Sequence, residues 1–376
     1  MIERLRHMLI KEFLQLFRDA KLRTMVFVMP LVQSLVFGYA VTTDVRDVPT
    51  AVVDFDQSVS SRELLSRFSA SGYFRFVSQT RDVDESTRLL DGGSVGAVLR
   101  IDKGFDEDLR AGRTATLQVI VDGTDSNTAG IVLDYSARIA GELSEQVLLA
   151  RFARLRGEGR LPGRVELASR AWFNENLESR NFYVPGVIAL IVMVITLMLS
   201  SMAVVREKEV GTIEQILVSP ITPAEFILGK TLPFALIGYA DVLLIAVIGV
   251  LWFDVPIRGN LLLLLLATTF YLMTTLGIGL FISTVSRTQQ QAMMSVFLFY
   301  FPAVLLSGFM FPIANMPVLV QYLTYANPLR FFLVILRGIF LKGAGPGTLW
   351  PQMAALLAMG IVTLLFTTRR FRKTMS

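Results

Sequence analysis

The chain has 376 residues, 53% of them hydrophobic, and a mean hydropathy of +0.55. This balance exceeds that of an ordinary water-soluble protein and indicates membrane spans. The lack of cysteine and the single histidine, His7, exclude disulfides, thiol catalysis and Cys- or His-rich metal sites, so we expect no metal and no cofactor bound by this chain.

The positions of the basic residues are more informative than the net charge of +5. Arginine and lysine collect in the first two dozen residues and in the last eight, beside long apolar runs. Such clusters are typical of the cytoplasmic ends of membrane spans, and no groove-reading motif accompanies them. We therefore expect contacts with membrane lipids and none with nucleic acid.

Residues 1–23 have the pattern of an amphipathic helix. Apolar side chains, among them Leu5, Leu9 and Phe13, recur at helical spacing, and charged residues occupy the rest of the circumference. This pattern predicts a helix that lies in the inner interface of the membrane. A solvated helical lead-in to the first span is the alternative.

Six stretches are long and apolar enough to cross a bilayer, whose hydrocarbon core of about 30 Å requires roughly 20 helical residues. They cover residues 24–42, 184–205, 231–253, 261–283, 292–311 and 349–368. The first also has features of a signal peptide, but its removal would place the C-terminal basic cluster outside the cytoplasm. We interpret residues 24–42 as an uncleaved first transmembrane helix.

The short loops set the orientation through the positive-inside rule. Basic residues precede the first span, separate the second from the third and the fourth from the fifth, and follow the sixth. The rule therefore places both termini in the cytoplasm. The sequence predicts a polytopic α-helical membrane protein with six transmembrane helices, the last five of them within residues 184–376.

Residues 44–183, between the first two spans, have the composition of a soluble domain. Four short apolar runs predict buried strands, at residues 50–54, 74–78, 95–101 and 116–121. Helical patterns alternate with these runs and end in a long helix over residues 128–155. This alternation predicts an inserted α/β domain, and the topology makes it extracytoplasmic.

Four aspartates lie at or just after the ends of two of these strands, namely Asp54, Asp56, Asp122 and Asp125. Carboxylates at strand ends are often catalytic or bind metals, but they also suit turns and helix N-caps. No histidine, cysteine or spaced nucleophile accompanies them. We expect structural roles for these residues and no active site in this domain.

The loop after the second span, residues 206–223, combines charges of both signs with a short amphipathic pattern that Pro220 ends. Such an element can dock on a cytoplasmic partner and pass rigid-body motion into the spans. An ordinary charged loop is the alternative. The candidate coupling residues are Arg206, Glu207, Glu209, Gly211, Thr212, Glu214 and Pro220.

Residues 228–231 end like a phosphate-binding loop without meeting its requirements. The glycine that the motif needs five residues before Gly229 is Ala224, and no buried strand precedes it. We expect no ATP site here, and we interpret Lys230 as a cytoplasmic anchor at the start of the third span.

Residues 308–342 are apolar but do not contain a seventh span. The stretch over residues 329–341 is too short to cross a bilayer and contains Arg330 and Arg337. These features are typical of a re-entrant or interfacial helix, here on the outer side. The two arginines could also extend to lipid headgroups.

Asp241 lies inside the predicted third span, where an ionisable group is costly and is by default a functional candidate. We assign it, with Ser200 and Thr275, to a candidate translocation path. For Asp241 the alternative is a position near the inner interface. Threonines such as those of the fourth span are more typical of contacts between helices.

The run REKEVGTIEQILVSPITPAEFILGK, residues 206–230, resembles the coupling-helix segment of the type-two ABC exporter permease family. Residues 286–292 resemble the polar start of that family's fifth span. Residues 307–317 and 327–330 resemble its outer re-entrant hairpin. The inserted domain is similar to that of the longer subfamily, so the resemblance covers the whole chain.

This resemblance implies a non-catalytic permease subunit in the bacterial cytoplasmic (inner) membrane that exports an amphipathic, drug-like or lipid-like substrate. ATP and Mg²⁺ are then bound by separate ABC ATPase subunits, and a second permease copy or a homologue completes the path. The position of the inserted domain allows a periplasmic membrane-fusion adaptor to dock. The implied outer gate consists of Phe309, Pro312, Asn327, Pro328, Arg330 and Arg337.

One alternative function belongs to a different class. A mechanotransmitting ABC membrane subunit moves its outer domain to regulate a periplasmic partner and transports nothing. Members of that class usually have four spans, which favours the exporter here. A membrane-bound enzyme is a further class, but the sequence contains no assembled catalytic set.

Overall fold

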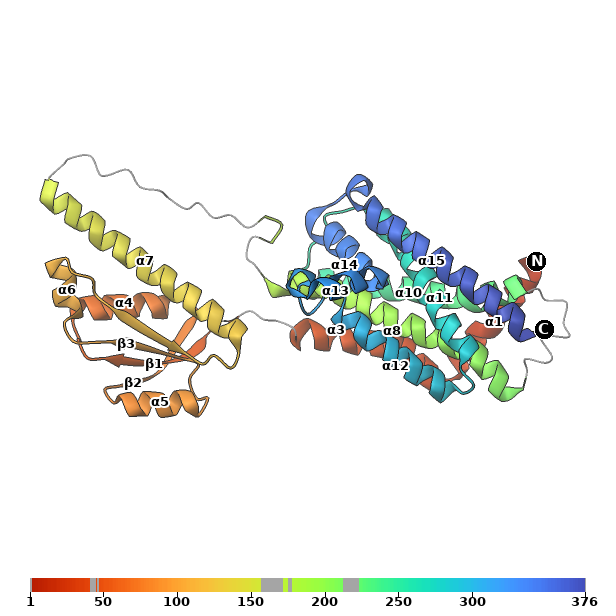
Figure 1. The fold of residues 1–376 in the computed structure, drawn as a ribbon, viewed down its shortest axis with the longest axis horizontal. Coiled ribbons are helices and arrows are strands. Elements are labelled where there is room, and N and C mark those ends of the chain that lie inside the picture. The colour runs from red at the N-terminus through yellow and green to blue at the C-terminus, as the bar shows by residue number, and fades with distance from the viewer. Residues whose placement is uncertain are drawn as a thin grey trace. The chain divides into compact units, whose positions relative to one another are not determined.

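A computed structural model describes residues 2–40, 45, 47–156, 172–174, 178–211 and 223–375. The chain divides into two compact units, Met1–Thr42 with Arg170–Ser376 and Thr43–Ser169. Figure 1 shows that the first unit is a helix bundle and that the second contains a sheet covered by helices.

Four helices of the first unit are long and apolar enough to cross a membrane. They are α8 (Ser179–Val210), α10 (Pro223–Leu251), α11 (Leu261–Val285) and α15 (Pro346–Met375). A bent helix pair would make a fifth span, so the described residues contain four or five candidates. The chain is therefore a multi-pass membrane protein.

The other two predicted spans coincide with shorter helices. The predicted span at residues 24–42 contains the π-helix η1 (Thr24–Val28) and α3 (Met29–Ala40), with residues 41–42 outside the described part of the chain. The predicted span at residues 292–311 overlaps α12 (Gln289–Leu305). The helix α12 ends before residue 311 because the chain turns at Gly308, whose φ of +81° is incompatible with a continuing helix.

The bent pair forms the hairpin predicted within residues 308–342. After η2 (Ile313–Asn315), the helices α13 (Val318–Leu323) and η3 (Thr324–Ala326) are followed by α14 (Pro328–Arg337) and η4 (Gly338–Lys342). The two arms meet at 85°. The sequence forces this break, since Asn327 caps α14 through the Leu329 N–H at 3.1 Å and Pro328 lacks the N–H that would continue the preceding helix.

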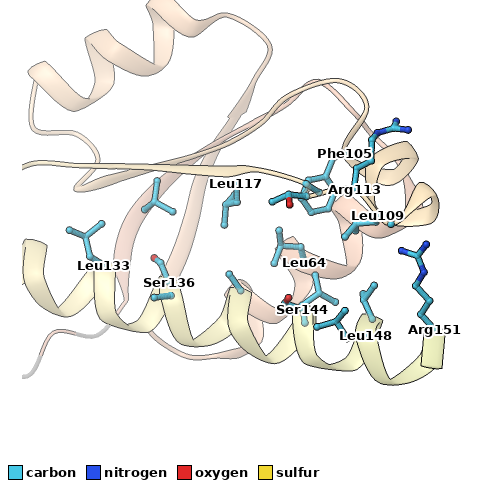
Figure 2. A pocket seen from close by; sticks show the side chains of 18 residues that line it. Leu64, Phe105, Leu109, Arg113, Leu117, Leu133, Ser136, Ser144, Leu148 and Arg151 are labelled. Atoms are coloured by element: carbon cyan, nitrogen blue, oxygen red, sulfur yellow. The ribbon is translucent and has the colours of Figure 1, made fainter. Parts of the chain in front are cut away.

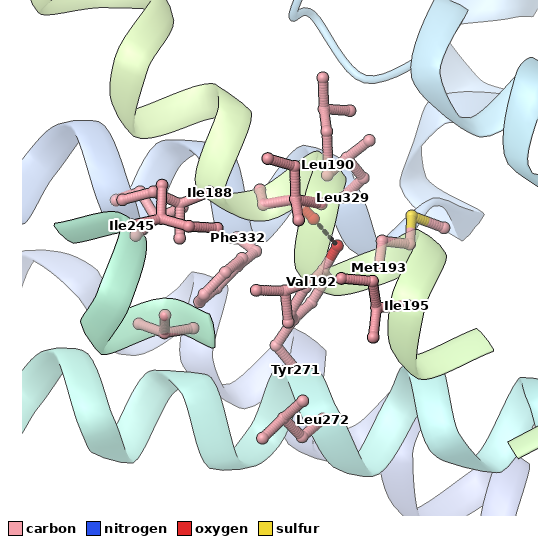
Figure 3. Close-up of a cluster of buried hydrophobic side chains, with 14 of the residues drawn as sticks. Ile188, Leu190, Val192, Met193, Ile195, Ile245, Tyr271, Leu272, Leu329 and Phe332 are labelled. Carbon is pink, nitrogen blue, oxygen red and sulfur yellow. Dashed lines mark hydrogen bonds between the residues drawn. The ribbon is translucent and has the colours of Figure 1, made fainter. Parts of the chain in front are cut away.

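The helix α8 lies at the centre of the bundle, and most of its apolar residues are buried. Figure 3 shows its side chains enclosed by those of α10, α11 and α14. The Tyr271 hydroxyl of α11 donates to the Ala189 carbonyl of α8 at 3.0 Å, and its ring stacks on Phe332 of α14 at 4.0 Å. A displacement of α8 therefore has to move its neighbours as well, because protein interiors are close-packed.

Two short helices precede this bundle, α1 (Ile2–Arg18) and α2 (Ala20–Arg23), and α1 packs on α10. Ile10, Leu14 and Phe17 of α1 are about half exposed. This outward apolar face is the one that an interfacial helix would present to lipid.

The second unit contains a four-stranded sheet of order β2-β1-β3-β4. The strands are β1 (Val48–Asp54), β2 (Phe74–Thr80), β3 (Ala97–Ile101) and β4 (Leu117–Val121), within two residues of the predicted positions. The strand β1 pairs in parallel with β2 and β3, whereas β4 is antiparallel to β3.

Helices cover both faces of the sheet. They are α4 (Val59–Ala70), α5 (Val83–Asp91), α6 (Phe105–Ala111) and α7 (Ser126–Arg156). Val52 and Leu99 face the side of α4, α6 and α7, whereas Val53 and Val98 face α5. Neighbouring residues of each strand thus face opposite sides of the sheet, as expected for a β-strand with both faces covered.

The aspartates after the strands are turn and cap residues. Asp54 accepts the N–H of Gln57 at 2.9 Å, and Asp56 accepts the N–H of Gly104 at 2.9 Å. Asp122 and Asp125 accept local N–H groups in the same way. The structural roles predicted for these four residues are confirmed.

Candidate functional site

The last charged turn of α8, Arg206–Glu209, is where the structure brings several predicted site residues together. We call these four residues the α8 cluster. Successive helical residues are about 100° apart, so four consecutive side chains point in four directions. Each of them contacts a different part of the bundle.

Glu207 is the buried member of the cluster. Its carboxylate lies 2.8 Å from the Lys230 ammonium of α10, which also lies 2.6 Å from Glu12 of α1. Lys11 approaches Glu207 at 3.2 Å from the exposed side. The three charged groups of Glu12, Glu207 and Lys230 thus join α1, α8 and α10.

Lys230 is only 3% exposed, and the cytoplasmic anchor role at the start of the third span that we expected for it stays a prediction. A buried ammonium is costly unless it is paired and hydrogen-bonded. Here the carboxylates of Glu12 and Glu207 compensate its charge.

The other cluster members contact other elements. Arg206 lies 3.6 Å from Asp19, which follows α1. The Lys208 ammonium donates to the Thr284 carbonyl at the end of α11, at 3.2 Å. Glu209 accepts the Gln289 N–H at 2.8 Å and also its side-chain amide, which ties α8 to the first residue of α12.

Gly211 ends α8 directly after the cluster. Its φ of +81° and its N–H bond to the Lys208 carbonyl at 3.3 Å are those of a helix C-cap. The predicted coupling residues Thr212, Glu214 and Pro220 lie outside the described residues. The chain returns at the start of α10, so residues 212–222 connect the cluster to the helix that contains Lys230.

A cavity of about 290 Å³ adjoins the α8 cluster. Its apolar wall is mainly methionine, and its residues are Met25, Met198, Leu199, Met202, Ala203, Phe234 and Met293. Its polar wall includes Glu12, Asp19, Arg206, Lys230 and Gln289. Methionine side chains adapt to ligands of varied shape, and the polar wall is made of residues that belong to the cluster or contact it.

Sequence reasoning missed Glu12, Asp19 and Gln289 as partners of the cluster. The sequence does indicate that Glu12 needs a partner. It follows Leu9 by three residues and precedes Leu16 by four, so its carboxylate lies on the apolar face of α1. A charge on such a face needs a buried partner.

The residues assigned to a translocation path lie inside the bundle. Ser200 and Thr275 are fully buried, and Ser200 packs against Gly279 where α8 crosses α11. The Thr196 hydroxyl of α8 donates to that of Thr275 at 3.0 Å. Asp241 is 3% exposed, and its Oδ2 has no hydrogen-bond partner among the described residues. The transport role of these residues stays a prediction.

The residues assigned to the outer gate are placed close to the start of α8. Phe309 lies over Gly186, where a Cβ atom would be 2.6 Å from its ring. The Arg337 guanidinium lies 3.6 Å from the ring centroid of Phe182 and donates to the Gly308 carbonyl at 3.4 Å.

The remaining gate candidates build the hairpin itself. Asn327 donates to the Ala303 carbonyl of α12 at 2.7 Å, and Pro328 begins α14. Arg330 lies 3.8 Å from the ring centroid of Tyr325 and donates to Thr324. Pro312 directly precedes η2. Protein groups thus hold both arginines of the hairpin, and the gate role of these residues stays a prediction.

Among the described residues, no group of three or more His, Cys, Asp or Glu side chains could hold a metal ion. The α8 cluster itself makes ion pairs and hydrogen bonds. Such contacts can transmit a displacement from one helix to the next.

Comparison with known proteins gives consistent matches over nearly the whole chain. A family model described as "ABC-2 family transporter protein" matches residues 22–369. The chain is 34% identical over 364 residues to "Probable multidrug ABC transporter permease YbhR" of Escherichia coli K12, and the match covers 96% of each chain. It is 33% identical over 377 residues to YbhS of the same strain, with 98% of this chain and 97% of the relative covered.

Proposed function

Because the chain belongs to the ABC-2 transporter family, we propose that it is the permease subunit of an ATP-driven exporter of amphipathic, drug-like or lipid-like molecules. Separate ATPase subunits bind ATP and Mg²⁺ and dock on residues 206–223. Two copies of the chain, or one copy and a homologue, surround the translocation path.

The α8 cluster is the observation that carries this proposal. An ATPase that displaces the segment after Gly211 acts on the end of α8. The cluster ties that end to α1, α10, α11 and α12 through Glu207, Lys208, Glu209 and their partners. One displacement can therefore reach several helices at once, as a rigid-body transition requires.

The adjoining cavity supports an amphipathic substrate. Its methionine wall suits an apolar body, and its polar wall suits a charged or hydrogen-bonding group. Lys230 and Arg206 belong both to this wall and to the ion pairs of the cluster. A molecule in the cavity would thus contact the groups that transmit ATPase motion.

The membrane topology that goes with this function has six spans, with α3 and α12 as the two shorter ones. Both termini are cytoplasmic, and the α/β unit is extracytoplasmic, where an adaptor could reach it. The hairpin closes the outer side of the path, with Phe309 and Arg337 holding it to the start of α8.

The first experiment measures coupling. The chain should co-purify with an ATPase encoded beside it, and substrate should stimulate ATP hydrolysis by the complex. Glu209→Ala and Gly211→Val should lower this stimulation about fivefold or more, the lower range of allosteric couplings. Leu228→Ala, at a 53% exposed position of α10 outside residues 206–223, is the matched control and should leave the stimulation unchanged.

Failure of co-purification would remove the proposal, and so would normal stimulation in both variants. Transport into sealed inverted vesicles then separates export from mechanotransmission. ATP-dependent accumulation of an amphipathic dye supports the exporter, whereas ATP hydrolysis without accumulation of any tested compound supports the mechanotransmitting subunit.

A further inference from the structure

The α/β unit contains a cavity of about 630 Å³ between α7 and the sheet. Figure 2 shows side chains of α7 facing those of α4, α6 and β4 across it. Small-molecule sites in proteins commonly measure about 300–1,000 Å³. This cavity therefore has the size of a ligand site, and it is built within one unit of the chain.

The cavity exists because one face of α7 has small side chains at its middle. Leu133, Ala137, Ala140, Ser144 and Leu148 recur at spacings of three and four residues and line it. In an ordinary amphipathic helix such a face carries large side chains that fill the space to the sheet. Here alanine and serine leave a channel along the helix axis.

The lining is apolar but remains accessible. Leu133 is 46% and Leu148 is 53% exposed, although both belong to the face that is turned to the sheet. Burial of this surface by an alkyl chain would be favourable through the hydrophobic effect.

One end of the cavity is basic. Arg113 is paired with Asp108 at 2.7 Å and Glu107 at 3.3 Å, and these hydrogen bonds raise the pKa of its guanidinium. Arg151 has no ion-pair partner in the part of the chain that the structure describes. Its guanidinium lies directly over Gly112, whose φ is +75° and which has no Cβ in the way.

Arg151 is thus a positive charge at the end of an apolar channel. It follows Leu133 by eighteen residues of α7, which corresponds to about 27 Å at 1.5 Å per residue. This length and polarity match one class of ligand, a single alkyl chain with an anionic head group.

We propose that this cavity binds a fatty-acid-like anionic amphiphile, with its alkyl chain along α7 and its carboxylate at Arg151. The complex is non-covalent, and the alkyl chain occupies the space beside Ala137 and Ala140. The proposal goes beyond the export function, because the cavity does not involve the α8 cluster and its occupation requires neither ATP nor transport.

The absence of cysteine from the chain allows a direct test on the full-length protein. Ser144→Cys places one thiol in the cavity, and Ser94→Cys places one at an exposed turn beside α5 as the matched control. Both variants are reconstituted in peptidiscs without detergent, and the rate of labelling by a membrane-impermeant maleimide is measured with increasing dodecanoate.

We expect dodecanoate to slow the labelling of the Ser144→Cys thiol and to leave that of Ser94→Cys unchanged. Adding Arg151→Gln should raise the half-maximal dodecanoate concentration about tenfold, equivalent to ~1.4 kcal/mol. Arg151→Lys should restore most of the effect. Dodecyltrimethylammonium, which has the opposite charge, should protect the thiol poorly.

Three results would overturn the proposal. The first is unchanged labelling of Ser144→Cys at dodecanoate concentrations below micelle formation. The second is equal protection by the cationic amphiphile. The third is slow labelling before any addition, which would mean that protein covers the cavity. Ala140→Phe, added to Ser144→Cys, gives an independent measurement. The phenylalanine ring should fill the cavity, so dodecanoate should no longer slow the labelling of the thiol, whereas the thermal unfolding temperature should not change.

Discussion

The ammonium of Lys230 lies 2.8 Å from the carboxylate of Glu207, and the two side chains are only 4% and 6% exposed. The pair joins the last turn of α8 to the first turns of α10. Buried ion pairs are weak contributors to stability, because the cost of removing both charges from water offsets their attraction. We therefore interpret this pair as a mechanical link between the two helices.

Lys230→Met should destabilise the protein by about 3–5 kcal/mol, because it leaves the carboxylates of Glu12 and Glu207 buried without a cation. Thermal unfolding of the purified protein measures this. The triple variant Glu12→Gln, Glu207→Gln, Lys230→Met should recover most of the stability while substrate-stimulated ATP hydrolysis stays low. Recovery of both would contradict a linking role.

Met293→Trp should reduce transport, because the larger side chain fills the 290 Å³ cavity beside the α8 cluster. Met294→Trp is the matched control, since its side chain is 64% exposed on the same helix. Dye accumulation in sealed vesicles is the measurement. Equal transport by the two variants would show that the cavity is not on the substrate route.

Gly186→Ala should destabilise the hairpin, because the added Cβ would lie 2.6 Å from the Phe309 ring. Overpacking of this kind costs about 1–3 kcal/mol. The double variant with Phe309→Leu should recover part of the loss, which a double-mutant cycle of unfolding free energies would detect. Additive effects would argue against the contact.

Asp241→Asn should raise the free energy of unfolding by about 1 kcal/mol. The reason is that the Oδ2 atom of Asp241 has no hydrogen-bond partner among the described residues, and an amide carries no charge to desolvate. Chemical unfolding of the purified protein is the measurement. A marked loss of stability would mean that the carboxylate has a favourable partner in the assembled transporter. Dye transport by the same variant tests its place in the translocation path.

The start of α6 should weaken in acid. Burial raises the pKa of Asp56, but hydrogen bonds from Ser58 and from the N–H groups of Asp106, Gly104 and Phe105 outweigh it, so the pKa lies below 3.8. A pKa lowered by folding means that the cap stabilises the helix above pH 3.8 and is lost as pH falls through the folded value.

Hydrogen exchange of the first α6 amides, corrected for the intrinsic rate, should therefore accelerate as pH falls below 3.8. In Asp56→Asn the corrected exchange should be nearly independent of pH over the same range. An acceleration of equal size in the variant would assign the effect to other carboxylates.

The strands of the α/β unit were predictable because each is a short, apolar run between turn residues, and a buried strand tolerates little else. The pairing was not predictable from these runs. The antiparallel β4 and the order β2-β1-β3-β4 depend on contacts between residues far apart in the chain, such as Val98 with Ile120. The cavity beside α7 also depends on those contacts.

The sequence by itself determined that the chain is a multi-pass membrane protein and that residues 206–223 are its distinctive charged segment. Both follow from local composition. A sufficiently long apolar run is stable inside the membrane, whereas a run of charged residues has to stay in contact with water. Only the tertiary structure decided which buried partners the charged residues at the ends of α8 and α10 contact. The sequence indicated a cytoplasmic anchor for Lys230 but not its partners, because Glu12 and Glu207 are far from it in the chain and only the packing of α1 and α8 against α10 brings them to its ammonium.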